Sequence, residues 1–207
     1  MTEIIKDPPG ATGALAWSDQ VKMTNEEIDE FLSGRWLCRL ATIRKDGSPH
    51  NAPLWYYWDG ECLYFVLTKN RLSCKNLKRD PRCAAVIDMD DRPLIGMRTN
   101  LAMAVHISGN AELYPQSSGS KITINAGPWK GTRTFDECKT TLLQRYGLWE
   151  RDGALGLTMD KLHRLIWDNE EIEGSQLAKD HEERVLVKII PEKIQSWDFS
   201  KAPIRKL

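Results

Sequence analysis

Two Asp-Gly dipeptides, at residues 46–47 and 59–60, constrain the fold more than any other feature of the sequence. They separate three runs with strand composition, at about 37–44, 49–58 and 61–68. Asp-Gly between strand-like runs is the strongest short-range signal for a tight β-hairpin. The first and third runs are apolar at most positions, which indicates burial on both faces. The sequence therefore predicts a three-stranded antiparallel meander inside a closed or heavily covered sheet.

The composition is that of an ordinary soluble globular chain with one domain. The chain has 207 residues, of which 41% are hydrophobic, and its 29 basic residues balance 29 acidic ones. A chain without net charge has no overall field to attract nucleic acid or an anionic membrane, so we expect neither as a partner. We find no secretory leader and no apolar run long enough to span a bilayer, and we expect a cytoplasmic protein.

The five cysteines and four histidines lack the spacings of known metal and redox sites. The number of cysteines is odd and no two form a C-x-x-C motif, which favours free thiols in a reducing compartment. Cys38, Cys62 and Cys83 fall in strand-like runs, where cysteine usually serves as a small core residue. We therefore predict that the protein has no dedicated metal site.

Two short helices are predicted on either side of the meander. The first begins after Thr24, which can form a capping box with Glu27. The second covers 73–80, with Ser73 as its N-cap and Pro81 directly after its end.

The remaining strands predict a mainly β architecture. Strands at about 83–88 and 103–114 follow the second helix. The chain is then expected to close with a hairpin of 184–190 and 194–199, which turns at Pro191. A small barrel is the arrangement that removes most exposed edges from so many antiparallel strands.

We expect a single domain with additions. Helical periodicity returns at about 134–147 and 158–168, whereas 115–132 looks irregular. Long elaborations of this kind often act as lids or interface extensions. The alternative is a structural helical cap that packs its tryptophans into a core. The expected parts are an extended N-terminal arm (1–20), the domain itself (21–201), a helical insertion within it before the last hairpin (115–182) and a short tail (202–207).

A phosphate-binding site is predicted where the third strand leads into the second helix. Backbone N–H groups and the positive end of the dipole at a helix start favour an anion. Arg71, Ser73 and Lys75 could add charge-assisted hydrogen bonds, and Thr68 could add a hydroxyl. The alternative is a capped surface helix with ordinary solvated lysines, and the spacing alone does not choose between them.

The order of these elements resembles a known family. The run RLATIRKDGSPHNAPLWYYWDGECLYFVLT, followed by Ser-Cys-Lys at 73–75 and Asp-Pro-Arg at 80–82, resembles the pyridoxamine 5′-phosphate oxidase-like split β-barrel flavoproteins. The late run ERVLVKIIPEKIQSWDFSK is similar to the closing strands of many members. The resemblance covers about 24–113 and 183–201, and the segment between them matches nothing in the family pattern.

The resemblance implies a six-stranded, Greek-key-like antiparallel split β-barrel. It also implies a homodimer that holds FMN at the subunit interface. Cys74 stands where many relatives carry arginine, and Arg71 is the candidate to replace that charge. On this basis the ring of FMN is expected along Ala52, Pro53, Leu54 and Trp55, and its phosphate at Leu67, Thr68, Arg71, Ser73, Cys74 and Lys75.

The function implied by the resemblance is an FMN-dependent oxidoreductase that acts on a small organic substrate. The cofactor carries the hydride chemistry in such proteins, so no catalytic residue is assigned. His50, Tyr56 and Tyr57 are candidates for a proton donor near the ring. The same aromatic run has a structural alternative, in which its rings fill the barrel and a subunit interface.

Two other functions stay open. One is a reductase that uses the deazaflavin coenzyme F-420, whose longer anionic tail would need Arg71, Lys75, Lys78 and Arg79. The other is a non-catalytic flavin- or haem-binding module, for which His106 or His163 would be the first candidate haem ligand.

Overall fold

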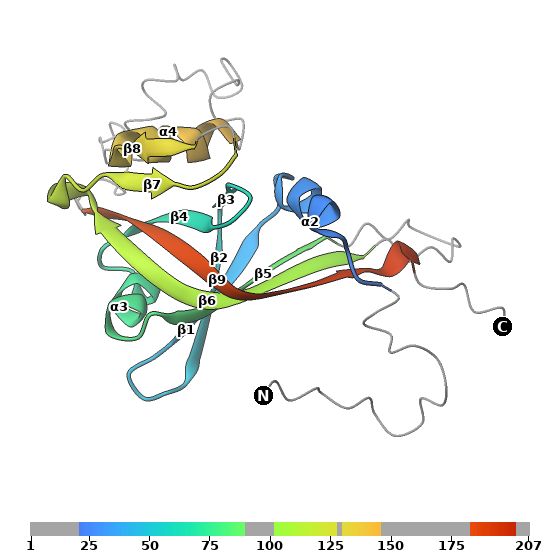
Figure 1. The fold of residues 1–207 in the computed structure, drawn as a ribbon. Helices are drawn as coiled ribbons and strands as arrows, with labels where there is room; N and C mark the ends of the chain where they lie inside the picture. Colours follow the sequence, from blue (N-terminus) through green and yellow to red (C-terminus); the bar gives the residue numbers. More distant parts are fainter. Residues whose placement is uncertain (1–20, 90–101, 128–129, 146–182, 202–207) are drawn as a thin grey trace, which may run out of the picture.

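Seven antiparallel strands form one curled sheet in the computed structural model (Figure 1). The structure describes residues 21–89, 102–127, 130–145 and 183–201. Its elements, labelled as in Figure 1, are α2 (Asn25–Leu32), β1 (Cys38–Ile43), β2 (Pro49–Leu54), β3 (Tyr57–Trp58), β4 (Leu63–Thr68), α3 (Leu72–Arg79), β5 (Arg82–Met89), β6 (Met103–Pro115), η1 (Gln116–Ser118), β7 (Ile122–Ile124), β8 (Gly131–Arg133), α4 (Phe135–Arg145), β9 (Arg184–Asp198) and η3 (Phe199–Lys201).

The sheet curls because its two edge strands follow each other directly in the chain. The strand order is β2-β1-β5-β6-β9-β4-β3, so only Trp55 and Tyr56 connect one edge to the other. The three residue steps from Leu54 to Tyr57 span at most about 11 Å. Tyr56 is fully buried, and its hydroxyl donates a hydrogen bond to the carbonyl of Leu32 at 3.0 Å. The short connection holds the two edges close together, as in a barrel that is split along one seam.

The mainly β, antiparallel split-barrel prediction is confirmed, but the sheet has seven strands instead of six. The run 49–58 was expected to form one strand. It forms two, because β2 pairs with β1 as far as Leu54 and β3 pairs with β4 from Tyr57. The chain therefore changes partners in the middle of the aromatic run.

Both predicted Asp-Gly hairpins are present. Gly47 and Gly60 have φ angles of +84° and +102°, which glycine adopts without the steric penalty of a Cβ atom. The carboxylate of Asp46 accepts hydrogen bonds from the backbone N–H and the hydroxyl of Ser48, at 3.0 and 2.7 Å. These turns place β1 against β2 and β3 against β4.

The predicted C-terminal hairpin is wrong, because β9 is one continuous strand of 15 residues. The first part of β9 pairs with β4, and β9 pairs with β6 along its length. Pro191 lies opposite Gly109, where the register shifts between Ser108 and Gly109. Proline has no backbone N–H to donate, so a strand accepts it at such an irregularity and continues. The insertion consequently precedes the last strand, not a last hairpin.

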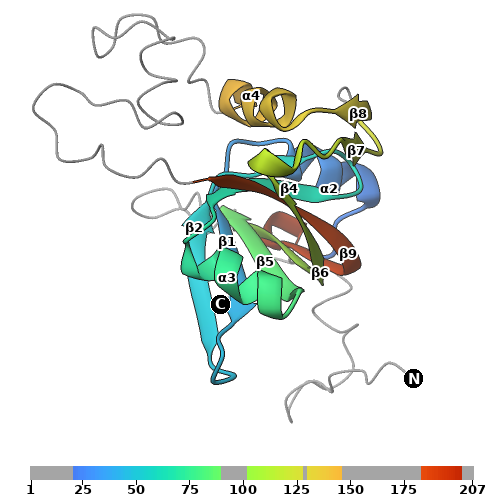
Figure 2. The same cartoon turned by 90° about the vertical axis from the view of Figure 1, so that its left-hand side faces the viewer.

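The segment after β6 contains regular structure where irregular chain was expected for 115–132. It contains η1 and the β7–β8 hairpin, and the helix predicted at 134–147 is confirmed as α4. A capping box starts α4: the backbone N–H of Glu137 donates to the Thr134 hydroxyl at 3.3 Å, and the N–H of Thr134 donates to the Glu137 carboxylate at 2.7 Å. Figure 2 shows β7, β8 and α4 together above β4, with α3 beside β1 lower on the barrel.

The capping box predicted for the first helix is confirmed in α2. Three further expectations fall outside the described residues: the N-terminal arm (1–20), the helix at 158–168 and the tail (202–207).

Strand β4 separates two apolar clusters. Leu63, Phe65 and Leu67 belong to the main cluster inside the barrel, whereas Tyr64 and Val66 pack in the second cluster beneath the insertion. Apolar side chains on both faces explain why the third run of the meander does not alternate with polar residues. The burial expected for this strand is confirmed.

All five cysteines are free and buried, as expected for small core residues. Burial raises the pKa of the Cys62 thiol to about 11 and that of the Cys83 thiol to about 12. Both thiols are therefore protonated and unreactive at neutral pH. Within the described ranges, no helix is both long and apolar enough to cross a membrane.

Gly109→Ala is expected to lower the free energy of unfolding by about 2 kcal/mol or more. A Cβ atom at this position would overlap the carbonyl oxygen of Ile190 and lie 3.0 Å from the Cα of Pro191, both of which belong to the backbone of β9. Urea denaturation followed by circular dichroism measures the effect. Ser108→Ala is the control and should change stability by less than about 0.5 kcal/mol. Equal stability of the two variants would contradict a close crossing of β6 and β9.

Candidate functional site

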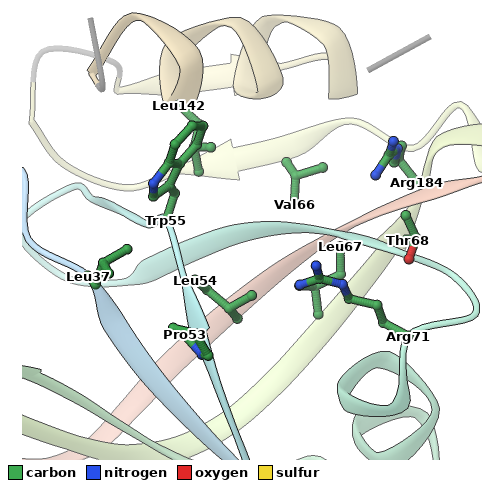
Figure 3. Close-up of a pocket in the computed structure, with 10 residues that line it drawn as sticks. All are labelled: Leu37, Pro53, Leu54, Trp55, Val66, Leu67, Thr68, Arg71, Leu142 and Arg184. Carbon is green, nitrogen blue, oxygen red and sulfur yellow. The ribbon is translucent and has the colours of Figure 1, made fainter. Parts of the chain in front are cut away.

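A cavity of about 340 Å³ lies between the ends of β2, β4 and β9, beside α3 and α4 (Figure 3). This volume is at the lower end of the range for small-molecule pockets, about 300–1,000 Å³. The described residues that line it are Leu37, Pro53, Leu54, Trp55, Val66, Leu67, Thr68, Arg71, Leu142 and Arg184. They come from distant parts of the chain, so the cavity exists only in the folded protein.

The cavity has a cationic end and an apolar end (Figure 3). Thr68 lies close to Arg71 and Arg184 at one end, where strand β4 finishes and β9 begins. Trp55 lies beside Leu142 at the other end. A ligand that fills this space would therefore meet Arg184 and Arg71 at one end, with the Arg71 guanidinium directed towards Leu67, and apolar walls at the other end.

Residues from both predicted halves of the site meet in this cavity. The two segments lie close together because the corner at residues 55–56 leads the chain from β2, at one edge of the sheet, to β3 at the other edge, next to β4. Ala52 is half-buried on β2, next to the lining residue Pro53. The predicted residues that line the cavity are Pro53, Leu54 and Trp55 from the ring half and Leu67, Thr68 and Arg71 from the phosphate half.

The start of α3 differs from the prediction. The helix begins at Leu72 with Arg71 as its N-cap, so the cap expected from Ser73 is wrong. A tight turn, in which the backbone N–H of Arg71 donates to the carbonyl of Thr68 at 3.1 Å, starts the helix earlier. Ser73 and Cys74 lie on its buried face, 2% and 4% exposed. The described lining of the cavity includes neither of them.

Lys75, the lysine expected at the phosphate, is exposed on α3 and is also absent from the described lining. Cys74 packs in the main apolar cluster with Leu77, and burial raises the pKa of its thiol. The position where relatives carry arginine is thus a core position in this chain. The binding roles of Ser73, Cys74 and Lys75 stay predictions.

A buried polar network fastens α3 to the β1–β2 hairpin. Nδ1 of His50 lies 3.4 Å from the Thr42 hydroxyl and 3.5 Å from the Ser73 hydroxyl. The amide of Asn76 donates to the Thr42 hydroxyl at 3.0 Å, and Arg79 donates to the amide oxygen of Asn76 at 3.3 Å. The network holds α3 in place. The N-cap of α3 is Arg71, which lies at the edge of the cavity.

The three candidate proton donors are absent from the described lining. His50 belongs to the network under α3, and the hydroxyl of Tyr56 is bound at the barrel corner. Tyr57 packs in the second apolar cluster, where burial and, to a smaller degree, the charge of Asp59 raise the pKa of its hydroxyl to about 12. None of these positions supports a proton-transfer role at the cavity.

The candidate haem ligand His106 lies on β6, in register with Val86 and Gln195 on the neighbouring strands. It is half-buried, and this burial, with a smaller effect of Lys193, lowers its pKa. In the part of the chain that the structure describes, no group of three His, Cys, Asp or Glu side chains is arranged to hold a metal ion. The other candidate, His163, lies outside the described residues.

Sequence reasoning missed four of the lining residues. Arg184 was assigned to a strand, but which strand it pairs with was not known; its partner is Thr68 on β4. Leu142 comes from the insertion, and its position over the cavity depends on how α4 docks. Leu37 and Val66 are apolar residues of predicted strands, where a core role was the simpler interpretation.

Residues 24–139, more than half of the chain, match the family model described as pyridoxamine 5′-phosphate oxidase. The chain belongs to this family.

Solved structures share the fold of this family member. A conserved hypothetical protein of Mycobacterium tuberculosis is 24% identical, with a TM-score of 0.51 over 95% of this chain and 97% of that chain. The flavocytochrome Anf3 of Azotobacter vinelandii is 12% identical, with a TM-score of 0.55 over 94% of this chain and 76% of that chain. At these identities the likeness shows a common architecture.

An ion pair lies next in sequence to the two residues Thr68 and Arg184 that line the cationic end of the cavity in this family member. Nζ of Lys69 lies 2.6 Å from the carboxylate of Glu183, and the backbone N–H of Lys69 donates to the carbonyl of Glu183 at 2.8 Å. The backbone N–H of Ser117 donates to the other carboxylate oxygen at 3.2 Å. These bonds extend the pairing of β4 and β9 by one residue beyond Thr68 and Arg184.

Glu183→Gln is expected to destabilise the protein at neutral pH but not in strong acid. Hydrogen bonds, first from Lys69 and then from Ser117, lower the pKa of the Glu183 carboxyl to about 2 in the folded protein, against about 4.3 for an ordinary glutamate. A lowered folded-state pKa adds stability above the unfolded-state value, and that stability is lost as the pH falls towards 2.

Melting temperatures of the wild type and Glu183→Gln, measured from neutral pH down to about pH 2, test this expectation. The difference between them should shrink below about pH 4.3, and added salt should reduce it at neutral pH. Glu61→Gln, at an exposed glutamate, is the control. A difference that does not change with pH would show that the carboxylate charge contributes nothing.

Proposed function

We propose that this protein binds FMN in the cavity between β2, β4 and β9 and works as an FMN-dependent oxidoreductase on a small organic substrate. The observation that carries the proposal is the polarity of the cavity, with two arginines and a threonine hydroxyl at one end and a tryptophan at the other. FMN has the matching order of parts: a terminal phosphate, a flexible ribityl chain and a planar apolar ring system.

The cationic end fits a phosphate group. Arginine presents several N–H donors in a planar fork that suits phosphate oxygens. Arg71 and Arg184 supply two such forks, and Thr68, the last residue of β4, lies close to both. Arg71 is the residue that the sequence suggested as a replacement for the arginine missing at Cys74.

The apolar end fits the ring system. Trp55 is 37% exposed and Leu37 is 47% exposed, which is high for large apolar side chains. Leu142 closes this end from the insertion. Planar rings bury large areas favourably against such side chains, so the ring would be held by the end of β2 and by α4.

Family membership and the flavocytochrome neighbour support a flavin as the cofactor. A bound flavin supplies the hydride or electron transfer, and the chain supplies position and exclusion of water. No pyridoxamine phosphate oxidase activity is proposed, because the sequence lacks the basic pattern that grips the phosphate of that substrate.

We further propose that the active form is a homodimer with the cofactor at the subunit interface. Leu37 and Trp55, exposed at the cavity, would be covered by the second copy of the chain. Light scattering after size-exclusion chromatography tests this, and a monomer that binds FMN with full affinity would contradict it.

The experiment for the cofactor has two parts. The absorption spectrum and the mass of any ligand released on denaturation are recorded for the purified protein. The ligand-free protein is then titrated with FMN, riboflavin and coenzyme F-420, each followed by its own fluorescence. Micromolar or tighter binding of FMN supports the proposal. A colourless protein that does not bind FMN, or one that clearly prefers F-420, overturns it.

Trp55→Ala is expected to raise the dissociation constants of FMN and riboflavin by the same factor, about 3- to 10-fold. Trp55 lies at the ring end, and the ring is common to the two ligands. Fluorescence titration measures both constants. Leu72→Ala is the matched control, because Leu72 is a 43% exposed apolar residue that is absent from the described lining. A loss confined to FMN would place Trp55 at the phosphate instead.

A further inference from the structure

We infer that Arg184 recognises the terminal phosphate of the cofactor and makes this site selective for a phosphorylated flavin over the same flavin without phosphate. This inference rests on the proposed FMN function and adds a residue, a position and a ligand class to it. Two features of the structure carry it, the strand register and the ion pair beside Arg184. The third argument is the charge of a phosphate monoester.

The strand register brings Arg184 to the phosphate end. Arg184 is the first residue of β9, and its partner on β4 is Thr68, the last residue of that strand. Arg71 follows Thr68 after a tight turn. Arg184 therefore joins Arg71 at one end of the cavity although the two residues are far apart in the sequence (Figure 3).

The neighbouring ion pair holds this position. Glu183 binds Lys69 through both its side chain and its backbone carbonyl. Lys69 directly follows Thr68, the partner of Arg184. The contact between Lys69 and Glu183 therefore extends the pairing of β4 and β9 by one residue beyond Arg184. The arginine is half-buried at the start of a 15-residue strand, where it pairs with Thr68 on β4. A side chain on a rigid element holds a ligand more accurately than one on a loop.

The charge of the ligand requires a second cation. A phosphate monoester carries a charge of about −1.5 to −2 at neutral pH, and one arginine neutralises only part of it. Lys75, the lysine expected to help, is exposed and absent from the described lining, whereas Arg184 is part of it. Arg71 and Arg184 together balance a dianion inside a partly desolvated cavity, where unbalanced charge is costly.

The experiment compares FMN with riboflavin, which differ only by the phosphate. Dissociation constants of both are measured by flavin fluorescence for the wild type, Arg184→Gln and Arg71→Gln. Arg184→Met keeps the apolar stem of the arginine and serves if the glutamine variant is unstable. Arg44→Gln is the control, because Arg44 is an exposed arginine in the β1–β2 turn, at the opposite end of that hairpin from Leu54. Thermal melts confirm that each variant is folded.

The expected result is that Arg184→Gln weakens FMN binding about 10- to 100-fold and leaves riboflavin binding within about 2-fold. Arg71→Gln should act in the same direction, and Arg44→Gln should change neither constant. Equal loss of both ligands in the Arg184 variants would mean that the residue only shapes the fold, which overturns the inference. An unchanged preference for FMN also overturns it, as does a wild type that binds the two ligands equally. A wild type that binds neither flavin refutes the proposed function itself.

Discussion

The corner at which the chain leaves β2 and enters β3 is the constraint on which the site depends. Two residues separate the strands, and the buried Tyr56 hydroxyl is bound to the carbonyl of Leu32 at the end of α2. Because this link is so short, the two edges of the sheet lie next to each other. The end of β2, which carries Pro53 and Leu54, thereby reaches the strand that carries Leu67 and Thr68. The corner therefore holds the two walls of the cavity together.

The local features of the fold could be predicted because their causes are local. A positive φ at glycine makes the Asp-Gly turns, and a threonine with a glutamate three residues later starts α2. What could not be predicted depends on contacts between distant segments. Pro191 looked like a turn because nothing in the sequence shows that Gly109 lies beside it and allows the strand to continue. Ser73 looked like a cap because the turn that starts the helix at Leu72 depends on the preceding strand.

The candidate site likewise contains residues that could be predicted from the sequence and residues that could not. The segments that supply most of its lining could be recognised from the order of motifs along the chain. Arg184 could not, since its place follows from the pairing of β4 with β9, and Leu142 could not, since α4 docks through a second apolar cluster on the outer face of β4. The barrel therefore supplies one set of walls, and the segment inserted between β6 and β9 supplies another.

That insertion leaves and re-enters the barrel at adjacent points, because Pro115 on β6 is paired with Val185 on β9. The free energy needed to close a loop between two fixed neighbouring ends grows only slowly with the length of the loop. A segment of different length could therefore join the same two points at little cost in closure free energy. Because Leu142 belongs to this segment and lines the cavity, such a change would alter the apolar end of the cavity. For protein engineering, the junction at residues 115 and 185 is a suitable place to graft another segment over the cavity.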